Sequence, residues 1–252
     1  MIFDFHVGID YSGAETPSAR LPGLQVFVAD GAAEPHRLAP PQRRHWNRSE
    51  IAEQLIAWAR AGCTFVAGID HGFGFPKSYC ERYGLRNWPT FLNDFCDRWP
   101  TADDGTTVDA VRRSNPRRGG ANDEYRLTER WTSNAKSVFQ FDVQGQVAKS
   151  THAGLPWLKQ VRDAAPDRVH VWPFDGWAIP EGKCVLAEVY PSLVRNRFPR
   201  GTRSVHEQDA YAVARWLHDF DEHGTLTPYF QPPLTNAERA TAELEGWILG
   251  VL

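Results

Sequence analysis

The sequence predicts an α/β protein with a mixed β-sheet that is flanked by helices. The first 70 residues read as three strands, one helix and a fourth strand, an order that produces a mixed sheet. The fourth of these strands is the apolar run 64–70, which is typical of a central strand buried on both faces. A chain of 252 residues is long enough to bury a large core, so we expect a single domain over 1–252.

The chain is expected to open with an antiparallel meander. Residues 3–10 alternate between apolar side chains and polar residues or glycine, which indicates a strand with two different faces. A second strand at 24–29 follows a turn-rich stretch. Residues 31–35 then turn the chain into a third strand near 36–39.

A helix is predicted to connect the meander to the fourth strand. Asn47 can cap this helix, and Glu50 stands at the spacing of a capping box. Apolar residues then recur at helical intervals from Ile51 to Ala59, and Gly62 fits the end of the helix. The apolar strand follows directly.

Residues 77–142 differ from the segments around them. They contain one plausible helix at 88–99 and a long polar stretch without an apolar core of its own. We therefore interpret them as a large insertion after the fourth strand. Regular structure is expected again from 138–143, followed by a helix at 155–165.

The last part of the chain is predicted to supply further strands and two helices. Possible strands lie at 169–172 and 184–190. Two capping boxes open the last helices: Ser204 with Glu207, to about residue 221, and Thr235 with Glu238, through residue 247.

Composition and charge exclude several classes of protein. Hydrophobic residues make up 42% and charged residues 23%, which excludes wholesale disorder. A net charge of −3 argues against a histone-like nucleic-acid binder but leaves room for a local basic patch. The apolar runs are strand-sized, no secretory signal is visible, and the four cysteines form no Cys-x-x-Cys pair. We therefore expect a cytoplasmic protein with free thiols and no membrane contact.

Two predicted strands end in the same tripeptide, Gly-Ile-Asp, at 8–10 and at 68–70. The glycine two residues before each aspartate shares its face, which leaves space beside the carboxylate for an ion or a phosphate. Asp10 and Asp70 are therefore candidate site residues. The alternative is that aspartate simply ends a strand and begins a turn.

Two further acids point toward the predicted core. Asp209 begins the apolar stripe of its helix, four residues before Val213, and a buried carboxylate needs a cation, hydrogen-bond donors or protonation. His206 lies on the same side of that helix. A structural bond to a loop is the alternative for Asp209. Glu188 interrupts an apolar strand and is either a site residue or the partner of one of the arginines.

Asp10, Asp70, Glu188 and Asp209 are predicted to converge at one end of the sheet. Carboxylate oxygens suit Mg²⁺ or Mn²⁺, and without metal four such groups would repel one another. Two ions held there would activate a water and stabilise the leaving oxygen of a phosphodiester. The predicted function is a metal-dependent nuclease for DNA or RNA, with the four acids as metal ligands and catalytic groups and His206 in support.

The chain also resembles known families. The strand-end Asp10, the β-β-β-α-β order and the His-x-x-Asp-Ala helix at 206–210 are similar to the ribonuclease H-like superfamily, in particular to RuvC-type Holliday-junction resolvases. More closely, the chain resembles the family called domain of unknown function 429, on the following pieces: Gly8-Ile9-Asp10, Gly68-Ile69-Asp70 with Gly74 and Pro76, Gly145-Gln146-Val147, Trp172-Pro173-Phe174, Glu188-Val189-Tyr190-Pro191 and Asp209-Ala210-Tyr211.

The resemblance implies a ribonuclease H-like mixed sheet of five strands flanked by helices. It implies that Asp10 carries the first-strand metal ligand, Asp70 or Glu188 the acidic residue of a later strand, and Asp209 the ligand on the last helix. RuvC-like enzymes place a glutamate where this sequence has Asp70. The shorter side chain leaves the choice between Asp70 and Glu188 open.

A run of arginines in the insertion is a candidate nucleic-acid contact. Arg112, Arg113, Arg117 and Arg118 would bind phosphates if the insertion lies beside the acids, and the alternative is a solvated, charge-rich loop. Two other functions fit these features. One is an actin-like phosphotransferase, and the other is a non-catalytic protein of the same fold that binds metal or nucleic acid. The sequence leaves the oligomeric state open.

Overall fold

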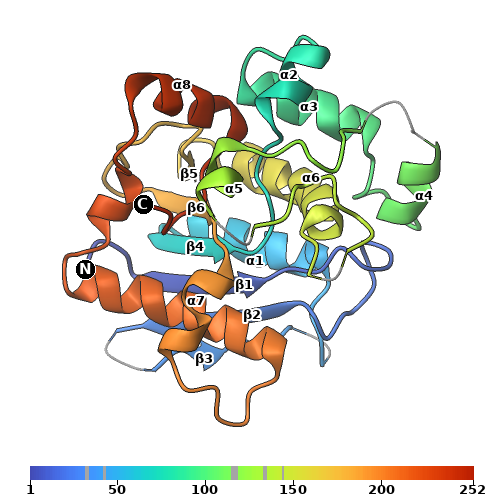
Figure 1. Cartoon of the computed structure of the whole chain (residues 1–252). Coiled ribbons are helices and arrows are strands. Elements are labelled where there is room, and N and C mark those ends of the chain that lie inside the picture. The colour runs from blue at the N-terminus through green and yellow to red at the C-terminus, as the bar shows by residue number, and fades with distance from the viewer. Residues whose placement is uncertain (32–33, 42–43, 115–118, 133–134, 144) are drawn as a thin grey trace.

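The centre of the molecule is a six-stranded mixed sheet (Figure 1). The structure is a computed structural model that describes residues 1–31, 34–41, 44–114, 119–132, 135–143 and 145–252. The strand order is β3-β2-β1-β4-β6-β5. An antiparallel meander is followed by three parallel strands, with these bounds: β1 (Phe5–Asp10), β2 (Gln25–Asp30), β3 (His36–Arg37), β4 (Phe65–Ile69), β5 (Val169–Trp172) and β6 (Cys184–Glu188).

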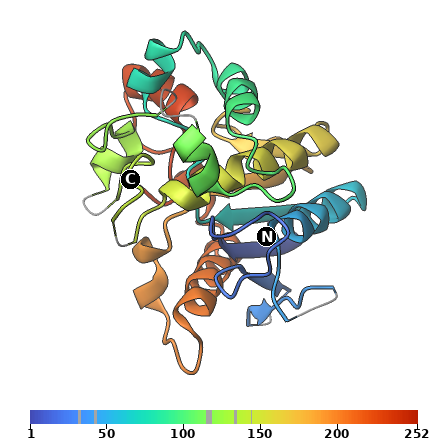
Figure 2. The ribbon, with the colours of Figure 1, turned by 90° about the vertical axis from the view of Figure 1, so that its right-hand side faces the viewer.

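Helices cover both faces of the sheet (Figures 1 and 2). On one face α7 (Val205–Glu222) packs along β1 and β2, and on the other α1 (Arg48–Arg60) and α6 (Ala148–Ala164) lie against each other. Because the central strands are covered on both sides, successive residues of β1 and β4 point alternately to the α7 face and to the α1/α6 face. This alternation decides where each candidate site residue points.

The segment between β4 and α6 is mostly helical. It forms α2 (Lys77–Arg82), α3 (Trp88–Arg98), α4 (Val108–Ser114) and α5 (Leu127–Trp131). α3 and α4 contact α6, and α2, α3 and α5 contact α8 (Asn236–Glu245). The buried aromatic side chains of this segment join the core cluster that also contains residues of β1 and β4, so the segment shares the main core. Within the described ranges, no helix is long and apolar enough to cross a membrane.

Three short 3-10 helices complete the described elements. η1 (Pro191–Leu193) and η2 (Arg195–Arg197) follow β6, and η3 (Thr227–Phe230) precedes α8. η1 and η2 both contact α7. They therefore bring the chain back from the sheet to the beginning of that helix.

The predicted helix caps are confirmed. Asn47 accepts a hydrogen bond from the Glu50 nitrogen at 2.8 Å, and the Glu50 carboxylate accepts one in return from the Asn47 nitrogen. The same reciprocal bonds are present at the predicted starts of α7 and α8. Gly62 follows α1 with φ of +87°, a backbone conformation that favours glycine.

Other predictions about elements were wrong. The sheet has six strands rather than five, because the runs 169–172 and 184–188 both join it and β5 extends the edge beyond β6. Residues 138–143, predicted as regular structure, form a turn, irregular chain and a bend, although Val138 is buried in the core. α6 begins at Ala148, well before the predicted start, since its first turns carry small and polar residues and lack an apolar stripe.

Candidate active site

Asp10 and Asp70 stand side by side at the carboxyl ends of two strands. β1 and β4 are parallel neighbours in which Ile9 lies beside Ile69, so the two aspartates follow at the same level of the sheet. The backbone nitrogen of Asp70 donates to the Ile9 carbonyl oxygen at 3.0 Å. The repeated tripeptide therefore does bring two carboxylates together.

Both of these aspartates face α7. A Cβ on Gly8 would stand 2.0 Å from the carbonyl oxygen of Ala210, and one on Gly68 would stand 2.6 Å from the Val213 side chain. The helix can pack directly on the two strands only because both positions are glycine. Since residues two apart on a strand share a face, the aspartates that follow these glycines also point toward the helix.

Asp209, near the start of α7, completes a group of three acids, which we call the acidic cluster (Asp10, Asp70 and Asp209). Burial raises the pKa of Asp70 well above its usual value, and the charges of Asp10 and Asp209 raise it further. Burial also raises the pKa of Asp209 to about 6, against the lowering effect of Arg195. The three carboxylates therefore lie close enough to oppose one another's ionisation.

Positive charge compensates the acidic cluster only in part. Nδ1 of His206 lies 2.6 Å from Oδ2 of Asp10, but the His206 side chain is 55% exposed. Nε of Arg195 lies 3.3 Å from Oδ1 of Asp209 without the alignment of a hydrogen bond, so both buried atoms lack a hydrogen-bond partner. The largest influences on the pKa of the Asp70 carboxyl are burial and the charges of Asp10 and Asp209, all of which raise it.

Glu188 points to the other face of the sheet. It lies beside Ile69, and Leu186, two residues earlier, belongs to the core cluster under α1 and α6. Arg126 donates to both Glu188 carboxylate oxygens, at 2.7 and 2.5 Å, and the Phe73 nitrogen donates at 2.9 Å. The arginine partner that the sequence left as an alternative is the one observed. Glu188 thus faces away from the acidic cluster, but it lines one small cavity together with Asp70, and its charge contributes to the raised pKa of Asp70.

Arg126 joins Glu188 and Glu129 into a buried ionic triad. Nε of Arg126 donates to Glu129 at 2.8 Å, and the Arg126 backbone nitrogen donates to the other Glu129 oxygen at 2.8 Å. Burial opposes the charge of Arg126, but Glu188 and Glu129 outweigh it and raise the pKa of the guanidinium. Every charged group of the triad has a partner, which is typical of a structural ion-pair network.

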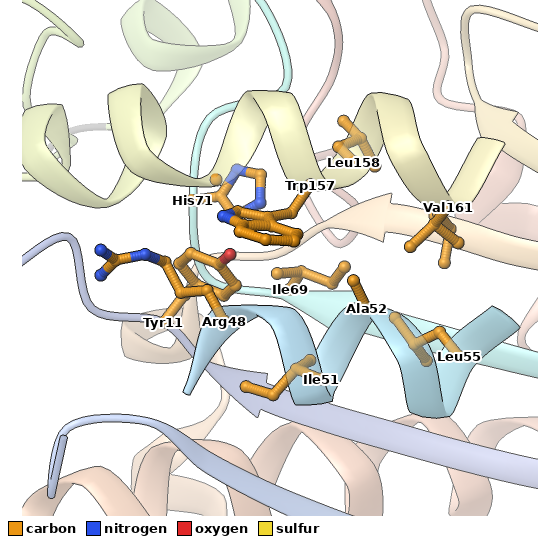
Figure 3. Close-up of a pocket in the computed structure, with 12 residues that line it drawn as sticks. Tyr11, Arg48, Ile51, Ala52, Leu55, Ile69, His71, Trp157, Leu158 and Val161 are labelled. Carbon is orange, nitrogen blue, oxygen red and sulfur yellow. The ribbon is translucent and has the colours of Figure 1, made fainter. Parts of the chain in front are cut away.

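The residues that follow the two strand-end aspartates, Tyr11 and His71, line a pocket on the α1/α6 face (Figure 3). Their rings contact each other at 4.7 Å between centroids, and Trp157 and aliphatic side chains enclose the rest. The hydroxyl of Tyr11 and the indole nitrogen of Trp157 have no hydrogen-bond partner. The free space is about 20 Å³, which is room for one water molecule and not for a substrate.

The arginines predicted to contact nucleic acid are only partly described. Arg112 on α4 donates to both carboxylate oxygens of Asp142, at 2.9 and 2.8 Å, so its charge is already paired. Arg113 on the same helix is exposed. Arg117 and Arg118 lie outside the described residues.

Arg195 is the site residue that the sequence analysis missed. It is the cation that acts on all three members of the acidic cluster. Arg195 is distant in sequence from Asp10 and Asp70, and it reaches them only because the segment after β6 returns to the start of α7. The available signal was the dense basic segment 195–203, which directly precedes the capping box of α7.

A different group of side chains has the closest spacing of potential metal ligands. Among the residues that the structure describes, atoms of His218, Asp219 and Glu222 lie within 4.8 Å of one another near the end of α7. Arg215 already pairs with Asp219 at 2.7 Å, and the carbonyl oxygen of Gly31 lies 2.6 Å from the His218 ring. This group is thus largely occupied by partners within the protein.

Comparison with known proteins adds no further constraint. No family model, curated protein or solved structure matches the chain.

Proposed function

We propose that the protein is a metal-dependent phosphodiester hydrolase that acts on nucleic acid. One observation carries the proposal: three carboxylates, of which Asp10 and Asp209 are buried and Asp70 is half-buried, face one another between the carboxyl ends of β1 and β4 and the start of α7, and the nearby cations compensate them only in part. Buried like charges cost free energy, which a bound cation would offset. Hard carboxylate oxygens favour Mg²⁺ or Mn²⁺ over softer metals.

Among the described residues the ligand atoms of these three aspartates do not all lie within 4.8 Å of one another, so the cluster would hold one divalent cation only after its side chains rotate closer together. Asp10, Asp70 and Asp209 would hold it, and the Oδ1 atom of Asp209 is buried without a hydrogen-bond partner. Such a cation lowers the pKa of a bound water and stabilises negative charge on a phosphoryl oxygen. The two-ion arrangement predicted from the sequence needed a fourth carboxylate, Glu188, whose oxygens both pair with Arg126. We therefore propose that the acidic cluster binds one ion instead of two.

His206 is proposed to position Asp10 and to carry a proton at the rim of the site. The hydrogen bond with Asp10 raises the pKa of His206, so a larger fraction of it is protonated near neutral pH than of a free histidine. Because the side chain is half-exposed, it can exchange that proton with solvent or with a leaving oxygen.

The arrangement of elements supports the resemblance to ribonuclease H-like proteins. The meander β1–β3 is followed by a helix and a parallel β4, with Asp10 on β1 and Asp209 on the long helix α7. In this interpretation β5 is an additional edge strand.

Cleavage assays test the proposed function. Labelled DNA, RNA and branched DNA are incubated with the protein and Mn²⁺, and we expect hydrolysis that is lost in Asp10→Asn. Asp163→Asn is the matched control, because this half-exposed aspartate lies on α6, away from the acidic cluster. If no substrate is cleaved, or if Asp10→Asn cleaves as fast as the wild type, the proposal is wrong.

A further inference from the structure

A pocket of about 300 Å³ opens next to the acidic cluster, at the beginning of α7. Asp209 belongs both to the cluster and to the wall of this pocket, so the two are continuous. The basic segment 195–203 supplies most of the remaining lining. The lining residues are Arg195, Asn196, Phe198, Arg200, Val205, Gln208 and Asp209.

The charge of this pocket is mainly positive. The guanidinium of Arg200 donates to the carbonyl oxygen of Arg203 at 2.7 Å, and that of Arg203 donates to the side-chain oxygen of Gln208 at 2.8 Å. Both acceptors are neutral. Among the described residues Arg200 forms no ion pair, whereas Arg203, which lies outside the pocket lining, is close enough to Glu34 and Glu207 for its charge to lower their pKa values. Arg195 offsets Asp209, the only acid in the lining.

The pocket is held in shape by hydrogen bonds. The amide nitrogen of Gln208 donates to the carbonyl oxygens of Arg195 and Phe198 at 3.0 and 2.9 Å, which ties the basic segment to α7. Arg203 also lies 3.6 Å from the centre of the Tyr211 ring. The segment that carries the arginines is thus preorganised, which lowers the entropy cost of binding.

One buried donor points to a missing ligand. Nε of Arg195 lies in the pocket lining without a hydrogen-bond partner, because its ion pair with Oδ1 of Asp209 at 3.3 Å lacks the alignment of a hydrogen bond. Buried polar groups in folded proteins normally have partners, and unpaired ones mark positions where water or a ligand binds. The arginine neighbours favour an anion over a cation at the mouth of this pocket.

We infer that this pocket binds a backbone phosphate of the nucleic-acid strand, next to the phosphate that is hydrolysed. The inference rests on the proposed function, because that function supplies the nucleic acid. Arg195 and Arg200 contact the phosphate oxygens, and the shared wall at Asp209 sets its position relative to the acidic cluster. The strand is then held by Arg195 and Arg200 rather than by the arginines of α4, where Asp142 already neutralises Arg112.

Binding of a labelled single-stranded DNA oligonucleotide tests this inference. Fluorescence anisotropy is measured in chelator without divalent metal, so that no hydrolysis occurs. We expect Arg200→Gln to weaken binding about tenfold, the effect of one charged hydrogen-bonding group. The plot of log affinity against log salt concentration should become shallower by about 0.7, the value for one phosphate contact on a single strand.

Two arginine variants serve as comparisons. Arg197→Gln is the matched control, because this neighbouring guanidinium lies 5.8 Å from the Phe220 ring and does not line the pocket, and its affinity should equal that of the wild type. Arg113→Gln tests the rival surface on α4. The inference is overturned if the wild type does not bind, if Arg200→Gln binds equally well, or if only Arg113→Gln loses affinity.

The same variants separate this inference from the proposed function. If Arg200→Gln loses affinity while Asp10→Asn still cleaves as the wild type does, the pocket stands and the hydrolase site is wrong. If Asp10→Asn loses cleavage while Arg200→Gln binds and cleaves as the wild type does, the hydrolase stands and the pocket is wrong.

Discussion

The two faces of the sheet carry two kinds of buried acidic site. On the α1/α6 face, Glu188 and Glu129 share one arginine, and each charged group of this triad is paired. On the α7 face, the acidic cluster has only a half-exposed histidine and a poorly aligned Arg195. Burial alone therefore does not mark a functional carboxylate. The two sites differ in whether the protein supplies a paired positive charge for each carboxylate. Variants that change these charges should therefore have opposite effects on stability at the two sites.

The largest effect is expected in the ionic triad. Arg126→Met would leave Glu129 and Glu188 buried without a partner, so it should lower the free energy of unfolding by about 3–5 kcal/mol. Urea denaturation measures this change. Arg112→Gln is the control, because its ion pair is exposed and is worth about 1 kcal/mol or less. A loss in Arg126→Met as small as that of the control would contradict the structural role of the triad.

In the acidic cluster, removal of a charge is expected to raise the free energy of unfolding. Asp70→Asn removes a charge that burial, Asp10 and Asp209 all disfavour, so the metal-free variant should be more stable than the wild type by about 1–2 kcal/mol. The same urea denaturation, in the presence of a chelator, measures it. If the variant proves less stable, Asp70 has a stabilising partner and is not a strained site residue.

A smaller effect is expected in the pH dependence of stability. Because the folded-state pKa of Asp209 is raised from 3.8 to about 6, the folded state holds its proton longer than the unfolded state. This contribution to stability is full below about pH 4 and is lost as the pH rises through about 6. The metal-free wild type should therefore lose stability relative to Asp209→Asn over this interval. If the free energies of unfolding of the wild type and of Asp209→Asn change equally with pH, the account of Asp209 is wrong.

The smallest effect is expected at His206. Its bond to Asp10 is half-exposed, so His206→Ala should cost about 0.5 kcal/mol in thermal or urea unfolding. Since the pKa of His206 is raised, this contribution is present at acidic pH and disappears as the pH rises through that raised value. A loss as large as that in Arg126→Met would show that the pair is structural.

Local patterns predicted part of this site, and contacts distant in sequence decided the rest. Strand alternation placed Asp10 and Asp70 on one face, and the helical stripe turned Asp209 toward them, because both arguments need only neighbouring residues. The partner of Glu188 could not be predicted in this way, since Arg126 stands 62 residues away in the segment interpreted as an insertion. Arg195 reaches the cluster only through the return of the chain after β6.

The same limit applies to the fold. The capping boxes and the meander were predicted because their signals lie within a few residues. The strand count was not, because the sequence does not show whether the run 169–172 joins the edge of the sheet. α6 was predicted too short for a local reason, since its first turns bury small and polar residues that carry no apolar pattern.

Calorimetric titration with Mn²⁺ at neutral pH tests the central claim most directly. We predict that the wild type binds Mn²⁺, that Asp70→Asn binds at least about tenfold more weakly, and that Glu222→Gln, a change in the other ligand-like group on α7, binds as the wild type does. Undiminished binding by Asp70→Asn, or loss of binding only in Glu222→Gln, would contradict the claim that the acidic cluster is a metal site.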